Sequence, residues 1–201
     1  GTTTTTLDTA SASIRIQQTA GAAQASATAS FTDARGRALR LTGDQFVRVS
    51  GVDLVGPGAD NRYSATVTAA PEYTVTVREP TRGVEETRID APAAFTITAP
   101  SVGGGAALSG FTLMWTGANT QLEIEITLSQ TLFGTVEQAT YGPFPDTGAR
   151  TFTAEDLQRF RQGAELTVTV NKLNTLDDVG GFASGTLAAG VAVSQALTPT
   201  P

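Results

Sequence analysis

The stretch Leu108–Leu128 constrains the fold more than any other part of the chain, because it contains two alternating runs on either side of a short turn. In the first run, Phe111, Leu113 and Trp115 share one parity. After a Gly-Ala-Asn turn, Leu122–Leu128 alternates strictly between aliphatic and polar residues. Period-two alternation with one polar face is typical of strands in a sheet that is buried on one side. The stretch therefore predicts antiparallel strands with the single Trp as a core anchor.

Short alternating runs recur through the chain and are separated by turns that contain Gly, Pro or Asp. Many short strands at regular spacing predict an all-β fold made of sandwiches. One helix is predicted over Thr153–Gln162, because Thr153 and Asp156 resemble a capping box and Gly163 can end the helix. The predicted strands outside the opening stretch are Ser13–Gln17, Ala25–Phe31, Arg37–Thr42, Gln45–Ser50, Val52–Val55, Tyr63–Val67, Tyr73–Val77, Val84–Ile89, Phe95–Ile97, Glu165–Lys172 and Thr186–Leu197.

A Pro- and Gly-rich break in the alternation predicts two tandem antiparallel β-sandwich domains of immunoglobulin-like type. We expect a disordered Thr-rich tether at residues 1–8 and an N-terminal sandwich at residues 9–100. A Gly-rich linker at residues 101–107 would lead into a C-terminal sandwich at residues 108–198, which contains the one short helix.

Composition excludes several kinds of chemistry. The 201 residues include no His and no Cys, so a Ser-His-Asp or Cys-His nucleophile and a His- or Cys-based zinc site are excluded. A net charge of −6 with scattered arginines disfavours nucleic acid, because phosphate binding needs clustered Lys and Arg. We expect no cofactor and no enzymatic activity. Only 16% of the residues are charged, which predicts a surface rich in Thr, Ser and Ala.

Charged residues that could carry catalysis have simpler interpretations. Lys172 is the only lysine and lies at a predicted strand end, where a solvated side chain is expected. Glu123 and Glu125 share the polar face of one strand, so they are expected to form part of a sheet surface. No catalytic residue is predicted.

Two sets of residues remain as candidate binding sites. Asp177 and Asp178 lie in a Gly-flanked loop and could donate oxygens to Ca²⁺, although their spacing matches no calcium loop and an Asp-rich turn is the interpretation we favour. Tyr141 and Phe144 lie in a predicted aromatic loop with neighbouring prolines. They could form a platform that stacks a sugar or peptide, or they could plug the end of a sandwich, which we favour.

Several segments carry a family resemblance. Phe95–Pro100 (FTITAP) leads through the Gly-rich break into Phe111–Trp115, and the capped segment Thr153–Leu157 precedes the strand Leu166–Val170. The chain thereby resembles immunoglobulin-like and fibronectin type III domains, and bacterial cell-envelope lipoproteins of unknown function that are built from tandem β-sandwiches. It departs from them in lacking a Cys pair, and the resemblance carries no catalytic residue. The matching residues are Ala91, Pro92, Phe95, Ile97, Pro100, Leu113 and Trp115.

The resemblance implies a location in the bacterial cell envelope, either in the periplasm or anchored to the outer membrane, or secretion. Membrane attachment is expected only through an N-terminal lipid anchor. The favoured function is a non-enzymatic role in adhesion, scaffolding or ligand binding, with an unknown protein or glycan as partner. A carbohydrate-active accessory module or a carboxylate-dependent glycosidase is the alternative. A third hypothesis is a chaperone-like protein that pairs an open edge strand with a peptide.

Overall fold

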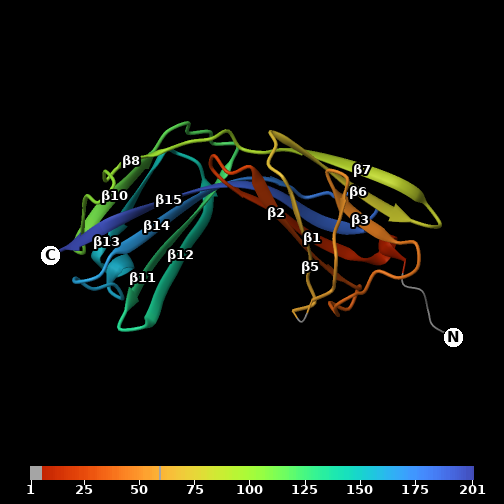
Figure 1. Ribbon diagram of the computed structural model, residues 1–201, viewed down its shortest axis with the longest axis horizontal. Helices are drawn as coiled ribbons and strands as arrows, with labels where there is room; N and C mark the ends of the chain where they lie inside the picture. Colours follow the sequence, from red (N-terminus) through yellow and green to blue (C-terminus); the bar gives the residue numbers. More distant parts are fainter. Residues whose placement is uncertain (1–5, 59) are drawn as a thin grey trace. The chain divides into compact units, whose positions relative to one another are not determined.

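The computed structural model describes residues 6–58 and 60–201, and it confirms an all-β fold in which antiparallel pairing predominates (Figure 1). The chain divides into two compact units. Unit 1 contains the described residues up to Pro92 together with Asn174–Gly190. Unit 2 contains Ala93–Leu173 and Val191–Pro201. The strands β14 (Leu166–Leu176) and β15 (Ser184–Thr200) therefore each contribute residues to both units.

Unit 1 contains two sheets. One is the β15-β1-β2-β5 part of an eight-stranded sheet, and the other has the strand order β4, β3, β6, β7. The bounds are β1 (Ser11–Thr19), β2 (Gln24–Thr32), β3 (Phe46–Val49), β4 (Val52–Asp53), β5 (Tyr63–Thr68), β6 (Glu72–Glu79) and β7 (Gly83–Asp90).

Both sheets of unit 1 contribute to one hydrophobic core. Ile14 and Ile16 from β1 are buried together with Val75 and Val77 from β6. Along each of these strands the buried residues alternate with more exposed ones, so each strand turns one face inward. Two sheets with a shared core are consistent with the predicted β-sandwich.

The start of the described chain differs from the predicted tether. Most of the proposed tether lies outside the described residues, but Leu7–Thr9 forms the short 3-10 helix η1. Leu7 is fully buried in the core of unit 1, and its amide donates to the Glu79 carboxylate over 3.1 Å. Asp8 is accordingly part of a folded element, because the apolar Leu7 side chain fixes the chain beside it.

Unit 2 also contains two sheets. One is the β12-β11-β14-β15 part of the same eight-stranded sheet, with β9 pairing in parallel to the end of β15, and the other has the strand order β13, β10, β8. The bounds are β8 (Ile97–Ala99), β9 (Gly105–Ala107), β10 (Gly110–Trp115), β11 (Glu123–Leu132), β12 (Thr135–Pro145), β13 (Ala149–Thr153) and the helix α1 (Ala154–Leu157).

The alternation predicted around Trp115 is present. Leu113 and Trp115 of β10 are buried, as are Ile124, Ile126 and Leu128 of β11. Between these residues, the polar positions Glu123, Glu125 and Thr127, which include the two glutamates of the predicted sheet surface, are only partly buried. The predicted inward and outward faces of this stretch are therefore confirmed.

Helix α1 is shorter than the predicted Thr153–Gln162. Its capping box is present, because the Thr153 side chain accepts from the Asp156 amide while Asp156 accepts from the Thr153 amide. The hydrogen bond from the Phe160 amide to the Leu157 carbonyl continues the chain in a turn. Phe160 and Leu157 are both buried, so packing extends beyond the regular helix.

Two other segments differ from their predicted structure. Residues 37–42 form only an isolated bridge between Thr32 and Ala38, because the Leu41 amide donates to the Tyr63 hydroxyl and not to a strand. The segment predicted as a linker at residues 101–107 contains β9 and is hydrogen-bonded to β15, for example from the Gly103 amide to the Ala196 carbonyl.

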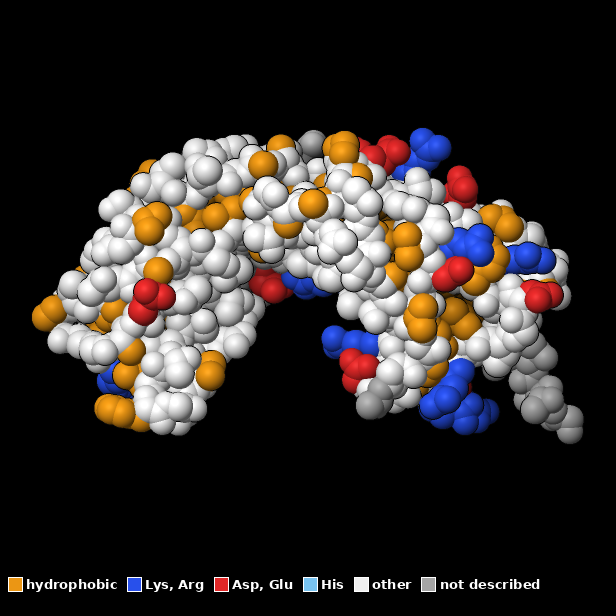
Figure 2. All heavy atoms as spheres, viewed as in Figure 1, with side chains coloured by type: hydrophobic (Ala, Val, Ile, Leu, Met, Phe, Trp, Pro, Cys, Tyr) orange, Lys and Arg blue, Asp and Glu red, His pale blue; other side chains and the backbone are white. Residues whose placement is uncertain are grey.

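The surface composition agrees with the sequence. In the view of Figure 2, uncharged polar side chains and backbone cover most of the surface, with charged side chains scattered among them. Among the described residues, no helix is both long and apolar enough to cross a membrane.

Candidate functional site

A cleft of about 920 Å³ in unit 1 is the candidate binding site. It is lined by Asp33 after β2, by the loop of residues 37–45, by Glu79 at the end of β6 and by the following Pro80–Thr81 turn. The loop carries Arg, Asp, Gln and Thr side chains next to the buried Leu39, so the cleft combines polar groups of both charges with apolar surface. This combination suits a polar ligand that is held by several directed hydrogen bonds.

The Glu79 carboxylate is the buried polar centre of this cleft. It is only 3% exposed and accepts hydrogen bonds at Oε2 from the Leu7 amide and from Nε2 of Gln45, at 3.1 and 2.9 Å. The Thr81 hydroxyl donates to Oε1 at 3.4 Å. A buried carboxylate with hydrogen bonds on both oxygens ties the first described residues, the loop and β6 together.

Asp33 and Arg37 form an ion pair on another wall of the cleft, in which Asp33 is partly buried and Arg37 is exposed. The guanidinium lies 2.7 Å from the Asp33 carboxylate, which also accepts from the backbone amides of Arg35 and Arg37. The side-chain hydrogen bond from Arg37 is the largest cause that lowers the pKa of Asp33 from its ordinary value. The pair closes the turn after β2, and both side chains remain accessible from the cleft.

A second hollow, of about 540 Å³, shares Gly43–Gln45 of the same loop with the cleft. Its wall includes the partly buried Phe46 ring, with the Arg48 guanidinium 4.0 Å from the ring centroid. Arg48 also forms an ion pair of 2.6 Å with Asp53. The loop thus contributes residues to two hollows.

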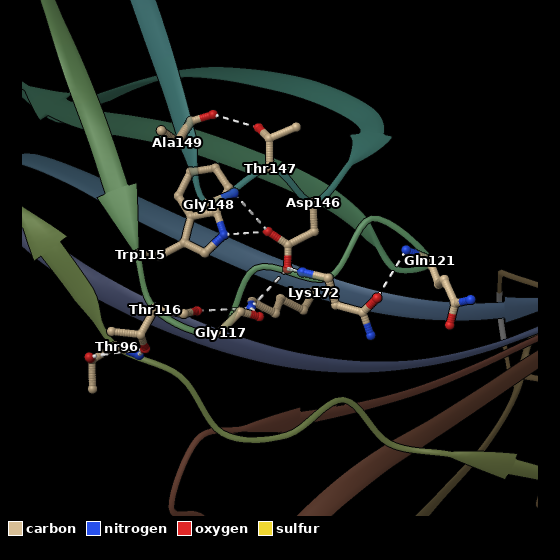
Figure 3. A network of polar contacts seen from close by, with 11 residues as sticks. Thr96, Trp115, Thr116, Gly117, Gln121, Asp146, Thr147, Gly148, Ala149 and Lys172 are labelled. Carbon is tan, nitrogen blue, oxygen red and sulfur yellow. Dashed lines mark hydrogen bonds and ion pairs between the residues drawn. The ribbon is translucent and has the colours of Figure 1, made fainter.

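Unit 2 contains a buried polar network around Asp146, which Figure 3 shows in close-up. Asp146 is fully buried, and its Oδ1 accepts from Nε1 of Trp115 at 2.7 Å and from the Gly148 amide at 3.1 Å. Its Oδ2 accepts from the Asn119 amide at 3.2 Å and lies 2.9 Å from Nζ of Lys172. Four donors therefore surround one carboxylate, which joins β10, β14 and two loops.

The prediction that Lys172 is solvated is wrong, because its side chain is buried. It is 1% exposed, and besides Asp146 it donates to the carbonyls of Thr116 and Gly117. Its Nζ also lies 4.7 Å from the centroid of the Phe95 ring. An ammonium has three N–H donors, and the two carbonyls and the carboxylate match that number. This arrangement favours a structural role in holding the chain between β10 and β11.

The sequence indicates that Lys172 is buried, but it gives no such indication for Asp146. Lys172 continues the parity of Leu166, Val168 and Val170, all of which are buried on β14. Parity alone therefore places it inward. Asp146 follows the end of β12 in a segment without alternation, so its burial depends on contacts that are distant in the sequence.

Tyr141 and Phe144 lie on strand β12 and not in a loop. The register between β11 and β12 shifts between Ile124 and Ile126, which accommodates Gly142 at a φ of 107°. The Tyr141 hydroxyl donates to the Asp156 carbonyl at 2.7 Å, and burial raises the pKa of Tyr141. Both aromatic side chains are partly buried, which fits the plug interpretation better than an open platform.

Asp177 and Asp178 are exposed in the segment between β14 and β15. They line a shallow hollow together with Glu86 and Arg88. Among the described residues, no group of three or more His, Cys, Asp or Glu side chains is arranged to hold a metal ion. The calcium site therefore stays a prediction.

The fold and these sites define an all-β protein of two compact units, one with a polar cleft and one with a buried charge network. Comparison with protein-family models and with curated protein sequences found no match to this chain.

Proposed function

We propose that the protein is a non-enzymatic binding protein of the bacterial cell envelope or the extracellular space, acting in adhesion, scaffolding or ligand binding. The cleft around Glu79 is the proposed ligand site, and a glycan or a polypeptide is the proposed class of partner. The observation that carries this proposal is a cleft of about 920 Å³ whose walls present charged and amide side chains beside apolar surface.

The hydrogen bonds of the buried charges support binding over catalysis. Glu79 is engaged by Leu7 and Gln45, and Lys172 is engaged by Asp146 and two carbonyls. A general acid or base needs a titratable group that can reach the substrate. These two buried side chains are instead held by protein partners, which is typical of groups that fix a structure.

The proposed location follows from the resemblance to envelope lipoproteins, with attachment through an N-terminal lipid anchor. A surface dominated by uncharged polar side chains is compatible with it. Metabolic labelling of the native protein with a palmitate analogue tests the anchor, and a protein that takes up no label contradicts it.

A glycan array, followed by calorimetry of the best ligand, tests the cleft. Arg40→Ala removes an exposed guanidinium from the cleft wall and should weaken the binding at least about tenfold, the loss expected for one charged hydrogen bond. Arg88→Ala, in the same unit but outside the cleft, is the matched control and should bind normally. Equal affinity of both variants would place the ligand elsewhere.

A carbohydrate-active accessory module or a carboxylate-dependent glycosidase is the second candidate, because Asp33, Asp44 and Glu79 line one cleft. Glycosidases use two carboxyl groups, separated by roughly 5–10 Å, on either side of the scissile bond. Incubating the array ligands with the protein and analysing them by mass spectrometry separates the candidates. Hydrolysis that Glu79→Gln abolishes would favour the glycosidase, and intact ligands would favour a protein that binds without hydrolysis.

A further inference from the structure

We propose that the outer edge of β12, with Phe133 at the tip of its hairpin, binds an extended segment of a partner polypeptide that offers an apolar pocket to the Phe133 ring. This interaction surface belongs to unit 2 and is independent of the cleft in unit 1. Figure 1 shows the β11–β12 hairpin extending to its own tip away from β8 and β10.

Phe133 occupies an unusual position for an aromatic residue. It forms a two-residue turn with Gly134 between the paired Leu132 and Thr135, and its φ is 50°. Turns of this type favour Asn, Asp or Gly at the first position, because a bulky residue is strained at positive φ. The Phe133 side chain is fully exposed, so no intramolecular packing compensates for the strain. An anchor for a partner accounts for both features.

The register identifies which backbone groups of β12 face outward. Leu132 and Thr135 flank a two-residue turn and so form a hydrogen-bonded pair of the β11–β12 ladder. Hydrogen-bonded and non-hydrogen-bonded pairs alternate along this ladder, so Val136, Gln138 and Thr140 of β12 make no backbone hydrogen bonds to β11. Their N–H and C=O groups therefore point away from β11. The hydrogen bond of 2.7 Å from Arg159 to the Gln138 carbonyl agrees with this direction.

This outer edge is open beside the hairpin tip. β12 ends the strand order of its sheet, so among the described residues no further strand pairs with it. The Gln138 carbonyl already accepts a hydrogen bond from Arg159. The outward-facing backbone groups nearest to Phe133 are therefore the N–H and C=O of Val136. The Val136 side chain is 63% exposed and extends the apolar surface of the tip.

A polypeptide is the occupant that these groups favour. A lipid bilayer would bury the outward backbone groups of Val136 without hydrogen-bond partners, which is unfavourable in hydrocarbon. The turn and the adjoining residues 131–138 also contain no Lys or Arg to attract anionic lipids, and the neighbouring Arg159 guanidinium is already hydrogen-bonded to the Gln138 carbonyl. An added strand supplies a donor and an acceptor at the required spacing, and its side chains can surround Phe133.

A second copy of this chain fits less well. An antiparallel pairing of two β12 edges that uses both Val136 and Thr140 is centred on Gln138. The Gln138 carbonyl at that centre already accepts from Arg159. The partner is therefore inferred to be a different polypeptide, which pairs near the tip.

The test is selection of a displayed library of linear 12-residue peptides on the full chain, followed by affinity measurements on three variants. Phe133→Asn relieves the strain at positive φ and should fold at least as stably as the parent. Val136→Pro removes an outward N–H that makes no bond to β11. Val102→Asn, at another exposed apolar residue of unit 2, is the control.

We expect enriched peptides whose affinity falls at least about tenfold with Phe133→Asn and with Val136→Pro, as for an interface anchor, and is unchanged with Val102→Asn. Failure to enrich peptides, or equal loss with all three variants, would overturn the proposal. Binding to phosphatidylethanolamine–phosphatidylglycerol vesicles that Phe133→Asn abolishes would assign the tip to a membrane. Self-association in ultracentrifugation that the same variant abolishes would assign it to a second copy.

Discussion

The rings of Phe31 and Phe182 stack within unit 1, with centroids 5.4 Å apart and planes 6° apart. Phe31 belongs to β2, whereas Phe182 precedes β15 near the other end of the chain. Val179, Leu187 and Ala189 join the same core. The core of unit 1 therefore includes a segment that the sequence-based boundaries assign to the second domain.

This arrangement predicts how fragments behave. Residues 1–100 alone lack the segment that carries Phe182, so we expect them to unfold without cooperativity when melting is followed by circular dichroism. In the intact chain, Phe182→Ala should destabilise unit 1 by about 3–5 kcal/mol, the usual cost of truncating a buried Phe. A stable, cooperative fragment 1–100 would instead support the boundaries predicted from the sequence.

Local alternation explains how far the sequence predicts this fold. It places β10, β11 and β14 correctly, because each contains a run in which buried aliphatic residues alternate with more exposed ones. It misses β12, where residues such as Val136 and Thr140 are exposed on one face while the other is only half-buried. An edge strand with little buried area leaves almost no hydrophobic pattern.

The sites were harder to predict than the strands. The Glu79 cleft depends on Leu7, Gln45 and Glu79 meeting across three separate segments, and the buried network depends in the same way on Asp146. No local period encodes such contacts between residues distant in the sequence. Residue types helped only to exclude functions, because a chain without His and Cys cannot use the catalytic and zinc-binding chemistry that needs them.

Arg37→Ala should raise the pKa of Asp33 towards its ordinary value, because the Arg37 side chain is the main cause of its lowering. A depressed pKa means that the pair stabilises the fold above the ordinary Asp pKa, and that this contribution is lost as the pH falls through the folded-state value. Carboxyl carbon shifts in an NMR titration measure the change. Arg35→Ala is the matched control, because Arg35 contributes only its backbone amide. Equal titration of Asp33 in the parent and in Arg37→Ala would contradict the assignment.

A chelator should leave the melting temperature unchanged. Asp177 and Asp178 are exposed, and among the described residues no acidic cluster is arranged to hold a metal ion. A ligand that binds only the folded state raises its stability, so removing a bound ion would lower the melting temperature. Calorimetry with and without EDTA checks this. A clear drop that the double variant Asp177→Asn/Asp178→Asn no longer shows would identify both residues as ligands.

Lys172→Met and Asp146→Asn should each destabilise unit 2 strongly. Either change leaves a buried partner without its counter-charge, which costs roughly 3–5 kcal/mol. The double variant should be less destabilised than the sum of the single variants, since it leaves neither charge alone. Urea unfolding followed by the fluorescence of Trp115, the only Trp and a residue of unit 2, provides the measurement. Additive effects would show that the two side chains stabilise the unit independently.

Trp115 is expected to be both a core anchor and the donor that orients Asp146. It is 5% exposed, and its Nε1 donates to the carboxylate at 2.7 Å. Trp115→Ala should cost about 3–5 kcal/mol, because it removes a buried ring. Trp115→Phe keeps most of the ring but loses the donor to a buried charge, so we expect a smaller loss of about 1–3 kcal/mol. Since a domain of this size is stable by only about 5–15 kcal/mol, the alanine variant should leave unit 2 only marginally stable.

The native indole of Trp115 should emit in the blue and resist quenching by acrylamide. Red-shifted emission that acrylamide quenches readily would place the indole in solvent, and would make the exposed aromatic platform the better interpretation of this unit.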